Sequence, residues 1–361
     1  MKRSGLLILL MTVVAGLSVA AWGLTLCEYR SPVTALADAR ASFAYRYYND
    51  AATSVVDVDS GRLALNYDQL YDSASYGFTL GGSAELTLDE FSPTGWLAQG
   101  AGTLRLYPWE GSHLFAFGGV EGAIATGQPR PGVEVLVGAG IGRFSDVTPL
   151  AKAIAMQSTV GDLPDEVLMA IAETLGRAAE YETLKEMVSD IEALIEGATG
   201  SVLGARELLT IEEVILATGD DRKCGWALQG GIGYELIDPY GGAQNIVVGV
   251  SADAAFATGP DDQLLFRASC SGPFDIMNEN RLTAGLSYER ILTENGTMIA
   301  DYALQRVKPA ELEASTSHLA GLSLGFDIGG VDVGLQISLS REPGDPGWSI
   351  DVSVAATMDL L

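Results

Sequence analysis

The sequence predicts an antiparallel β-barrel that spans a membrane and is interrupted once by an α-helical insert. Apolar residues stand at every second position over many segments, and turn residues separate those segments. Mean hydropathy is positive, at +0.22, although the net charge is −26. A period of two is the period of a β-strand. A strand with lipid on one face and a wet lumen on the other alternates in this way, which reconciles the hydropathy with the charge.

The alternation is clearest near the C-terminus. Ile350, Val352 and Val354 are separated by Asp351 and Ser353, so one face is apolar and the other is polar. A soluble sandwich would turn the apolar face to a dry core instead. Predicted strands of about 9 to 15 residues are long for a soluble domain and suit tilted spans. These lengths favour the barrel.

About fourteen strands are predicted, within a range of twelve to sixteen. The first six lie near 40–48, 62–70, 76–90, 95–107, 112–126 and 131–144. The other eight lie near 223–237, 243–258, 262–271, 280–292, 297–308, 316–328, 330–341 and 347–359. Turn sequences such as Asp238-Pro239 and Gly329-Gly330 join them.

The segment 147–220 has a helical period and divides the strands into two groups, 24–146 and 221–361. Thr148-Pro149 predicts a helix start with an N-cap and proline at the first position. Three or four amphipathic helices follow, whose apolar stripes can pack on each other. With an even strand number both termini lie on the same side of the membrane, and the insert follows strand six. We therefore expect the insert on that side or folded into the lumen as a plug.

The N-terminus predicts a secretory signal peptide over 1–23. Lys2 and Arg3 precede an apolar stretch from Leu6 to Ala20, and small residues follow near the expected cleavage site. The chain has three cysteines, Cys27, Cys224 and Cys270. One disulfide with one cysteine left over and three isolated thiols both remain open.

Aromatic residues gather near predicted strand ends, as at Tyr76, Trp96, Trp226 and Trp348, like the girdle at a membrane interface. In these features residues 40–361, apart from the insert, resemble the porin-like bacterial outer-membrane β-barrel class. The resemblance is one of architecture and not of a specific family's motif. It implies a place in the outer membrane of a diderm bacterium, with both termini in the periplasm. The insert is then expected in the periplasm or, as a plug, in the lumen. One departure is the C-terminus, which is Leu361 where this class commonly has an aromatic residue.

The predicted register turns many charged residues into the lumen. The expected acidic wall comprises Glu85, Asp89, Glu121, Glu134, Glu235, Asp253, Glu289, Asp301, Asp327, Asp332 and Asp351. The main cations expected there are Arg46, Arg105 and Arg267. A negative wall attracts cations into a water-filled pore. The sequence thus predicts a passive, cation-preferring channel for small solutes or ions.

Two other interpretations remain. The lumen can be packed with hydrogen-bonded polar groups and closed. Alternatively, the protein can be a structural or assembly barrel whose insert, 147–220, docks a periplasmic partner. Outer-membrane lipid is an expected contact in each case.

Other functions are disfavoured. The acidity argues against nucleic acid, which binds through Lys and Arg. No metal, phosphate or dinucleotide motif is present, so no cofactor is expected. His318 shares a face with Thr316, as a hydrolase could require, but no acidic partner is evident and a girdle or rim position is favoured. We therefore expect no enzyme.

Overall fold

The computed structural model describes residues 24–48, 58–217, 221–239, 245–293, 296–310, 312–327, 332–341, 343–344 and 347–359. The signal peptide predicted over 1–23 lies outside these residues.

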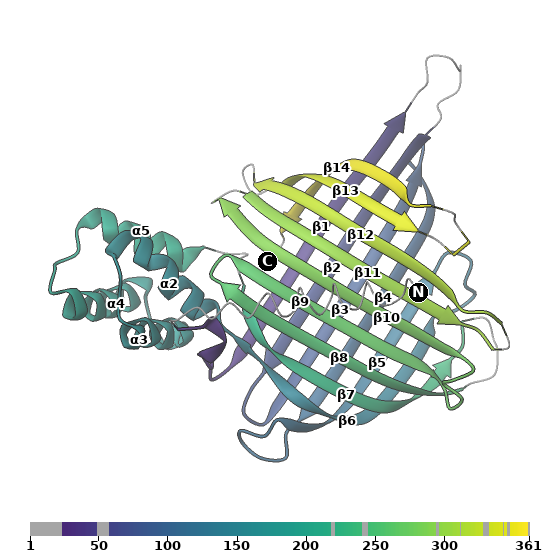
Figure 1. Ribbon diagram of the computed structural model, residues 1–361, viewed down its shortest axis with the longest axis horizontal. Coiled ribbons are helices and arrows are strands. Elements are labelled where there is room, and N and C mark those ends of the chain that lie inside the picture. The colour runs from purple at the N-terminus through teal and green to yellow at the C-terminus, as the bar shows by residue number, and fades with distance from the viewer. Residues whose placement is uncertain are drawn as a thin grey trace, which may run out of the picture.

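Fourteen antiparallel strands form one closed barrel, in which each strand pairs with its neighbours in the chain and β1 pairs with β14 (Figure 1). Six precede the insert: β1 (Thr34–Tyr48), β2 (Val58–Asp72), β3 (Tyr76–Asp89), β4 (Ser92–Leu106), β5 (Leu114–Ala125) and β6 (Gly132–Asp146). Eight follow it: β7 (Lys223–Ile237), β8 (Ile246–Gly259), β9 (Asp262–Pro273), β10 (Asn280–Thr293), β11 (Gly296–Lys308), β12 (Ser315–Asp327), β13 (Asp332–Arg341) and β14 (Ser349–Asp359). The predicted fold class is confirmed.

The first strand differs most from its predicted bounds. It begins at Thr34 and not near residue 40, and Thr34 pairs with Asp72 of β2. Ala35, Ala37 and Ala39 occupy its early part. Alanine has low strand propensity, so this segment carries little strand signal of its own. Pairing with β2 holds it in the sheet.

The insert contains α2 (Thr148–Val160), α3 (Asp165–Gly176), the 3₁₀ turn η2 (Ala178–Glu180), α4 (Leu184–Thr199) and α5 (Ala205–Leu216). Leu150, Ile171, Ile191 and Ile195 are fully buried in its apolar core. The helices therefore bury their stripes on each other, as amphipathic helices do. Within the described residues, no helix is long and apolar enough to cross a membrane.

The predicted N-cap at Thr148 is wrong. The cap position is Val147, and Thr148 is already helical. The carboxylate of Asp146 accepts a hydrogen bond from the Thr148 amide at 2.9 Å, so it satisfies the helix start from outside. The Thr148 hydroxyl instead accepts a hydrogen bond from the Arg222 amide at 2.8 Å. It thereby joins the beginning of the insert to its end.

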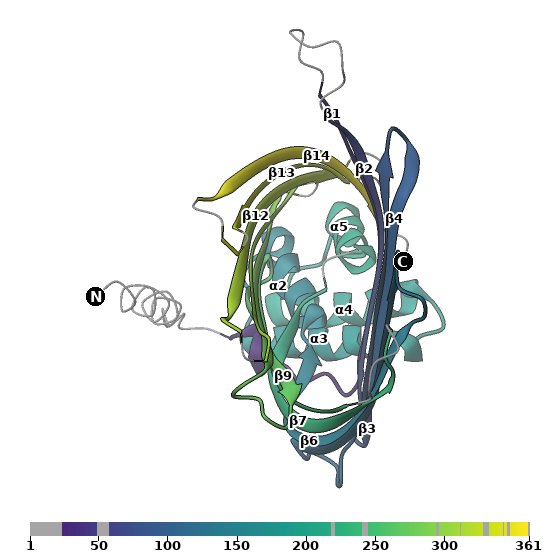
Figure 2. The same cartoon turned by 90° about the vertical axis from the view of Figure 1, so that its right-hand side faces the viewer.

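The insert lies at one end of the barrel, beyond the strand ends (Figure 1). Figure 2 looks along the barrel, which has a flattened outline. The helices of the insert are visible through the barrel's opening. We call this end the insert rim. It is formed where β1 and β7 begin, at Thr34 and Lys223, and where β2 and β6 end, at Asp72 and Asp146.

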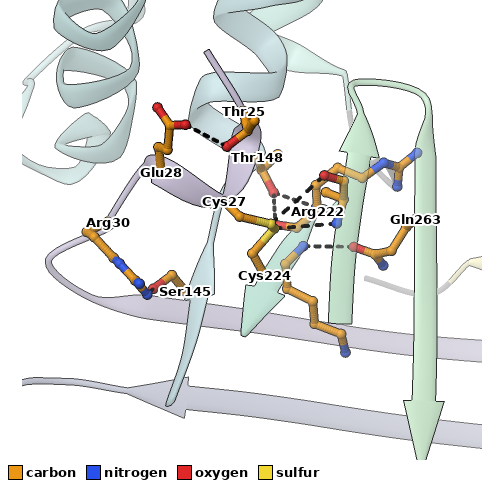
Figure 3. The surroundings of a disulfide bond; sticks show 11 residues. Thr25, Cys27, Glu28, Arg30, Ser145, Thr148, Arg222, Cys224 and Gln263 are labelled. Carbon is orange, nitrogen blue, oxygen red and sulfur yellow. Dashed lines mark hydrogen bonds between the residues drawn. A yellow bond between two sulfur atoms is a disulfide. The ribbon is translucent and has the colours of Figure 1, made fainter. Parts of the chain in front are cut away.

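A disulfide fastens the N-terminal segment to the insert rim. Cys27, in the 3₁₀ turn η1 (Leu26–Glu28), is bonded to Cys224 of β7, and their Cα atoms are 5.3 Å apart (Figure 3). Cys270 is free. Of the two alternatives left open, the chain has one bridge and one remaining thiol. Tyr29 follows, and its hydroxyl donates to the Ala172 carbonyl of α3 at 3.0 Å. The segment is thus held between insert and barrel.

Candidate lumen site

Cross-strand pairing identifies the two faces of the wall, because paired residues point to the same side of a sheet. Leu63 of β2 pairs with Leu86 of β3, which pairs with Trp96 of β4. Leu63 and Trp96 are 40% and 45% exposed. This apolar row belongs to the outer face, and residues of the opposite parity face the interior.

The register gives interior parity to every residue of the predicted charged wall. The acidic members are Glu85, Asp89, Glu121, Glu134, Glu235, Asp253, Glu289, Asp301, Asp327, Asp332 and Asp351. The basic members are Arg46, Arg105 and Arg267. For Arg46 and Asp332 only the strand position is described.

At least three of these acids have arginine partners among the described residues. Glu85 forms an ion pair with Arg62 of β2. The Asp253 carboxylate lies 2.7 Å from Nε of Arg267, across the β8–β9 pair. Glu289 lies 3.3 Å from Nη1 of Arg222, which is buried. Their negative charge is locally balanced.

Three glutamates form a row without such balance. Glu121 of β5 pairs in register with Glu134 of β6, which pairs with Glu235 of β7. Among the described residues none of the three has an ion-pair partner. We call Glu121, Glu134 and Glu235 the glutamate row. Like charges on neighbouring strands repel, so the row favours a nearby cation.

The glutamate row lines a cavity of about 600 Å³ in the barrel. Asp68 and the polar side chains of Asn66, Ser83 and Gln99 also line it, as do Arg267 and Arg281. Glycines of β3 to β6 form much of the remaining wall and leave space, namely Gly81, Gly82, Gly100, Gly122 and Gly132. The cavity is large enough for a small polar solute.

The interior narrows towards the insert rim. Phe144 of β6 is 9% exposed and packs with Ala227 and Ala255, and Leu70 of β2 and Leu265 of β9 pack against them. Three strands separate β2 from β6 in the wall. A cluster containing both Leu70 and Phe144 therefore crosses the interior. We call these five residues the apolar constriction.

Several charged residues of the interior face were not predicted from the sequence. They are Asp38, Asp68 and Asp72, and the cations Arg40, Arg62, Lys223 and Arg281. The period-two alternation could have predicted an interior position for most of them. Asp38 is different, because it lies in the alanine-rich start of β1, which carries little strand signal. The added acids and cations nearly cancel, so the net charge of the interior stays close to that of the predicted list.

His318 has an outer-face position, not an interior one. Its Nδ1 lies 2.8 Å from the Tyr302 hydroxyl, and its ring is 5.9 Å from the Trp348 ring. Such a group is typical of an aromatic girdle. In the described part of the chain, no group of three or more His, Cys, Asp or Glu residues could hold a metal ion.

No family model and no curated protein matches the chain. Among solved structures, it is similar to OccK2 (OpdF) of Pseudomonas aeruginosa, with 11% identity, a TM-score of 0.37 and coverage of 90% of this chain and 98% of that one. It is also similar to the outer membrane channel DcaP of Acinetobacter baumannii, with 9% identity, a TM-score of 0.36 and coverage of 91% and 97%. A third similar structure is a BenF-like porin from Pseudomonas fluorescens, with 8% identity, a TM-score of 0.35 and coverage of 90% of this chain and 98% of that one.

Proposed function

We propose that this protein is an outer-membrane barrel that passes small solutes by diffusion and prefers cations. The observation that carries the proposal is the lumen cavity of about 600 Å³, lined by the glutamate row. A closed wall with an apolar outer face and a charged, glycine-rich interior suits a water-filled passage across lipid. Cations would concentrate where negative charge is unbalanced.

The glutamate row should set the preference more than the rest of the wall. Glu85, Asp253 and Glu289 have arginine partners, so their fields largely cancel at a distance. Glu121, Glu134 and Glu235 have no such partner among the described residues and stand beside one another. Their fields add in a low-dielectric wall.

The insert rim is the periplasmic end in this proposal. In this proposal the 1–23 signal directs export, and the barrel inserts with both termini in the periplasm. The insert then lies in the periplasm, at the inner mouth of the channel. The insert carries thirteen acidic and four basic residues between 148 and 217. An acidic body at the mouth adds to the attraction for cations.

Single-channel recording in planar bilayers under a salt gradient tests the proposal. The wild type should give discrete steps with a cation-selective reversal potential. Replacing all three residues of the glutamate row by glutamine should shift the reversal potential towards that of an unselective pore. A matched control removes three acids from the insert surface, with Asp162→Asn, Glu166→Gln and Glu182→Gln, and should shift it less. Silence from a heat-modifiable, folded barrel would overturn the channel, and steps without selectivity would overturn the cation preference.

A structural or assembly barrel remains the second candidate, because the insert exposes an apolar ridge. Val202 is 85% exposed, and Leu209 and Leu216 of α5 are 60% and 59% exposed. A spacing of seven residues puts Leu209 and Leu216 on one helix face. Docking of a periplasmic partner through the insert predicts that Leu209→Ser with Leu216→Ser abolishes cross-linking of that partner in cells. A pore alone predicts unchanged conductance and no specific cross-link in either protein.

A further inference from the structure

A second cavity, of about 250 Å³, lies at the insert rim. It is enclosed by the segment before β1, the β2–β3 and β4–β5 connections and the end of β6. Its lining includes two arginines, Arg30 and Arg143, together with His113. In a chain with 47 acidic and 21 basic residues, two arginines in one small pocket are unexpected by composition.

Arg143 is held in place by contacts that leave part of its guanidinium unused. Its guanidinium carbon lies 3.8 Å from the centre of the Tyr107 ring, and Nη2 donates to the Ala74 carbonyl at 2.9 Å. Nε is buried and has no hydrogen-bond partner among the described residues. A stacked arginine loses little freedom when it binds an anion.

The other lining groups also suit an anion. Nη1 of the exposed Arg30 lies 3.5 Å from the Ser145 hydroxyl, a weak contact that a better acceptor can replace. The hydroxyls of Ser31 and Ser73 also line the pocket, and each donates its proton to a backbone carbonyl, that of Val33 and that of Tyr76 respectively. Asp72 is the acidic residue of this lining, and its carboxylate already accepts a hydrogen bond from the Tyr107 hydroxyl at 2.7 Å. The cationic groups therefore exceed the anionic one.

We propose that this rim pocket binds a phosphate group. The guanidinium groups of two arginines are donors that phosphate oxygens prefer. The volume is below the range of about 300 to 1,000 Å³ typical of drug-sized ligands, so it suits one compact anionic group. At the end of a membrane-spanning barrel, that group belongs either to a phospholipid headgroup or to a free phosphate.

Two binding measurements separate the sources. Calorimetric titration of the detergent-solubilised protein with inorganic phosphate measures the free anion. Native mass spectrometry after incubation with micelles doped with phosphatidylglycerol, or with phosphate-free diacylglycerol, measures the headgroup. Saturable phosphate binding supports a free-anion site, and retention of phosphatidylglycerol but not diacylglycerol supports a headgroup site. A protein that shows neither overturns the proposal.

Variants assign the binding to the pocket. Arg30→Gln changes an exposed side chain and should weaken binding about tenfold, the value of one charge-assisted hydrogen bond. Arg143→Gln should weaken it at least as much, with folding checked by heat modifiability. Arg290→Gln is the matched control, because Arg290 is an exposed arginine of β10 paired with Asp262 outside the pocket. Equal effects of Arg30→Gln and Arg290→Gln would overturn the proposed site.

Discussion

The hydroxyl of Thr34, at the start of β1, accepts a hydrogen bond from the amide of Asp146 at the end of β6, at 2.9 Å. These strands are not neighbours in the wall, since β2 to β5 lie between them. The bond therefore draws opposite walls together at the insert rim. The apolar constriction around Phe144 lies where the walls approach.

Phe144→Ala should widen the lumen at the insert rim. The change removes the largest side chain of the apolar constriction, in which Leu70 and Leu265 pack across the interior. If conduction passes this point, single-channel conductance should rise severalfold in planar bilayers. The truncation should also destabilise the rim, within the usual cost of about 3 to 5 kcal/mol for a buried phenylalanine.

Phe266→Ala is the control for this change. Phe266 lies on β9 with outer-face parity and is 40% exposed, so its side chain points away from the lumen. Its loss should leave conductance unchanged. Equal conductance in the wild type and Phe144→Ala would mean that the constriction does not limit flow.

The disulfide should stabilise the attachment of the N-terminal segment to the insert rim. Cys27 and Cys224 are 197 residues apart, and bridging a long segment restricts the unfolded chain. Replacing both by serine should lower the free energy of unfolding by about 2 to 4 kcal/mol. Limited proteolysis of the insert should become faster. Cys270→Ser alters the free thiol and should change neither measurement.

The two-faced wall could be predicted because it is encoded locally. In β14, Ile350 and Val352 alternate with Asp351, and no distant contact is needed to place them on opposite faces. The same alternation gives interior parity to the glutamate row. Its cross-strand adjacency could not be predicted, because it depends on the register of β5, β6 and β7 together.

Other features arise only from closure of the barrel. Glu289 forms an ion pair with Arg222, which follows the insert. The sequence around either residue does not predict this ion pair. The contact of Leu70 with the Phe144 cluster requires the walls to approach each other. From the sequence alone, Phe144 is an aromatic residue near a strand end. Nothing in the sequence around it predicts a contact across the lumen.

Gly140 allows close packing between strands inside the barrel. A Cβ atom at this position would lie 2.4 Å from the Phe115 ring and 2.7 Å from the Leu228 carbonyl. The backbone carbonyl cannot move without disturbing the β6–β7 pair. Gly140→Ala should therefore lower the temperature at which heat modifiability is lost. Gly118→Ala, whose nearest neighbour would be 3.9 Å away, should leave that temperature nearly unchanged.

Tyr29 should make the insert sensitive to high pH. Burial, followed by the negative charges of Asp146 and Glu173, raises the pKa of its hydroxyl to about 12. The unfolded chain releases this proton near pH 10. The folded state therefore holds the proton more tightly, and its stabilising contribution is complete below pH 10 and lost as the pH rises towards 12. Helical circular dichroism and proteolysis of the insert should report loosening in that window.

Tyr29→Phe separates this titration from general alkaline unfolding. The variant loses the hydrogen bond to the Ala172 carbonyl, so it should be less stable at neutral pH by about 1 kcal/mol. It should then lose less further stability between pH 10 and 12 than the wild type does. Tyr181→Phe is the comparison, because the hydrogen bond to Asp190 at the surface of the insert is the main cause of that tyrosine's raised pKa. Identical alkaline curves for the wild type and Tyr29→Phe would show that ionisation of Tyr29 does not control the attachment of the N-terminal segment.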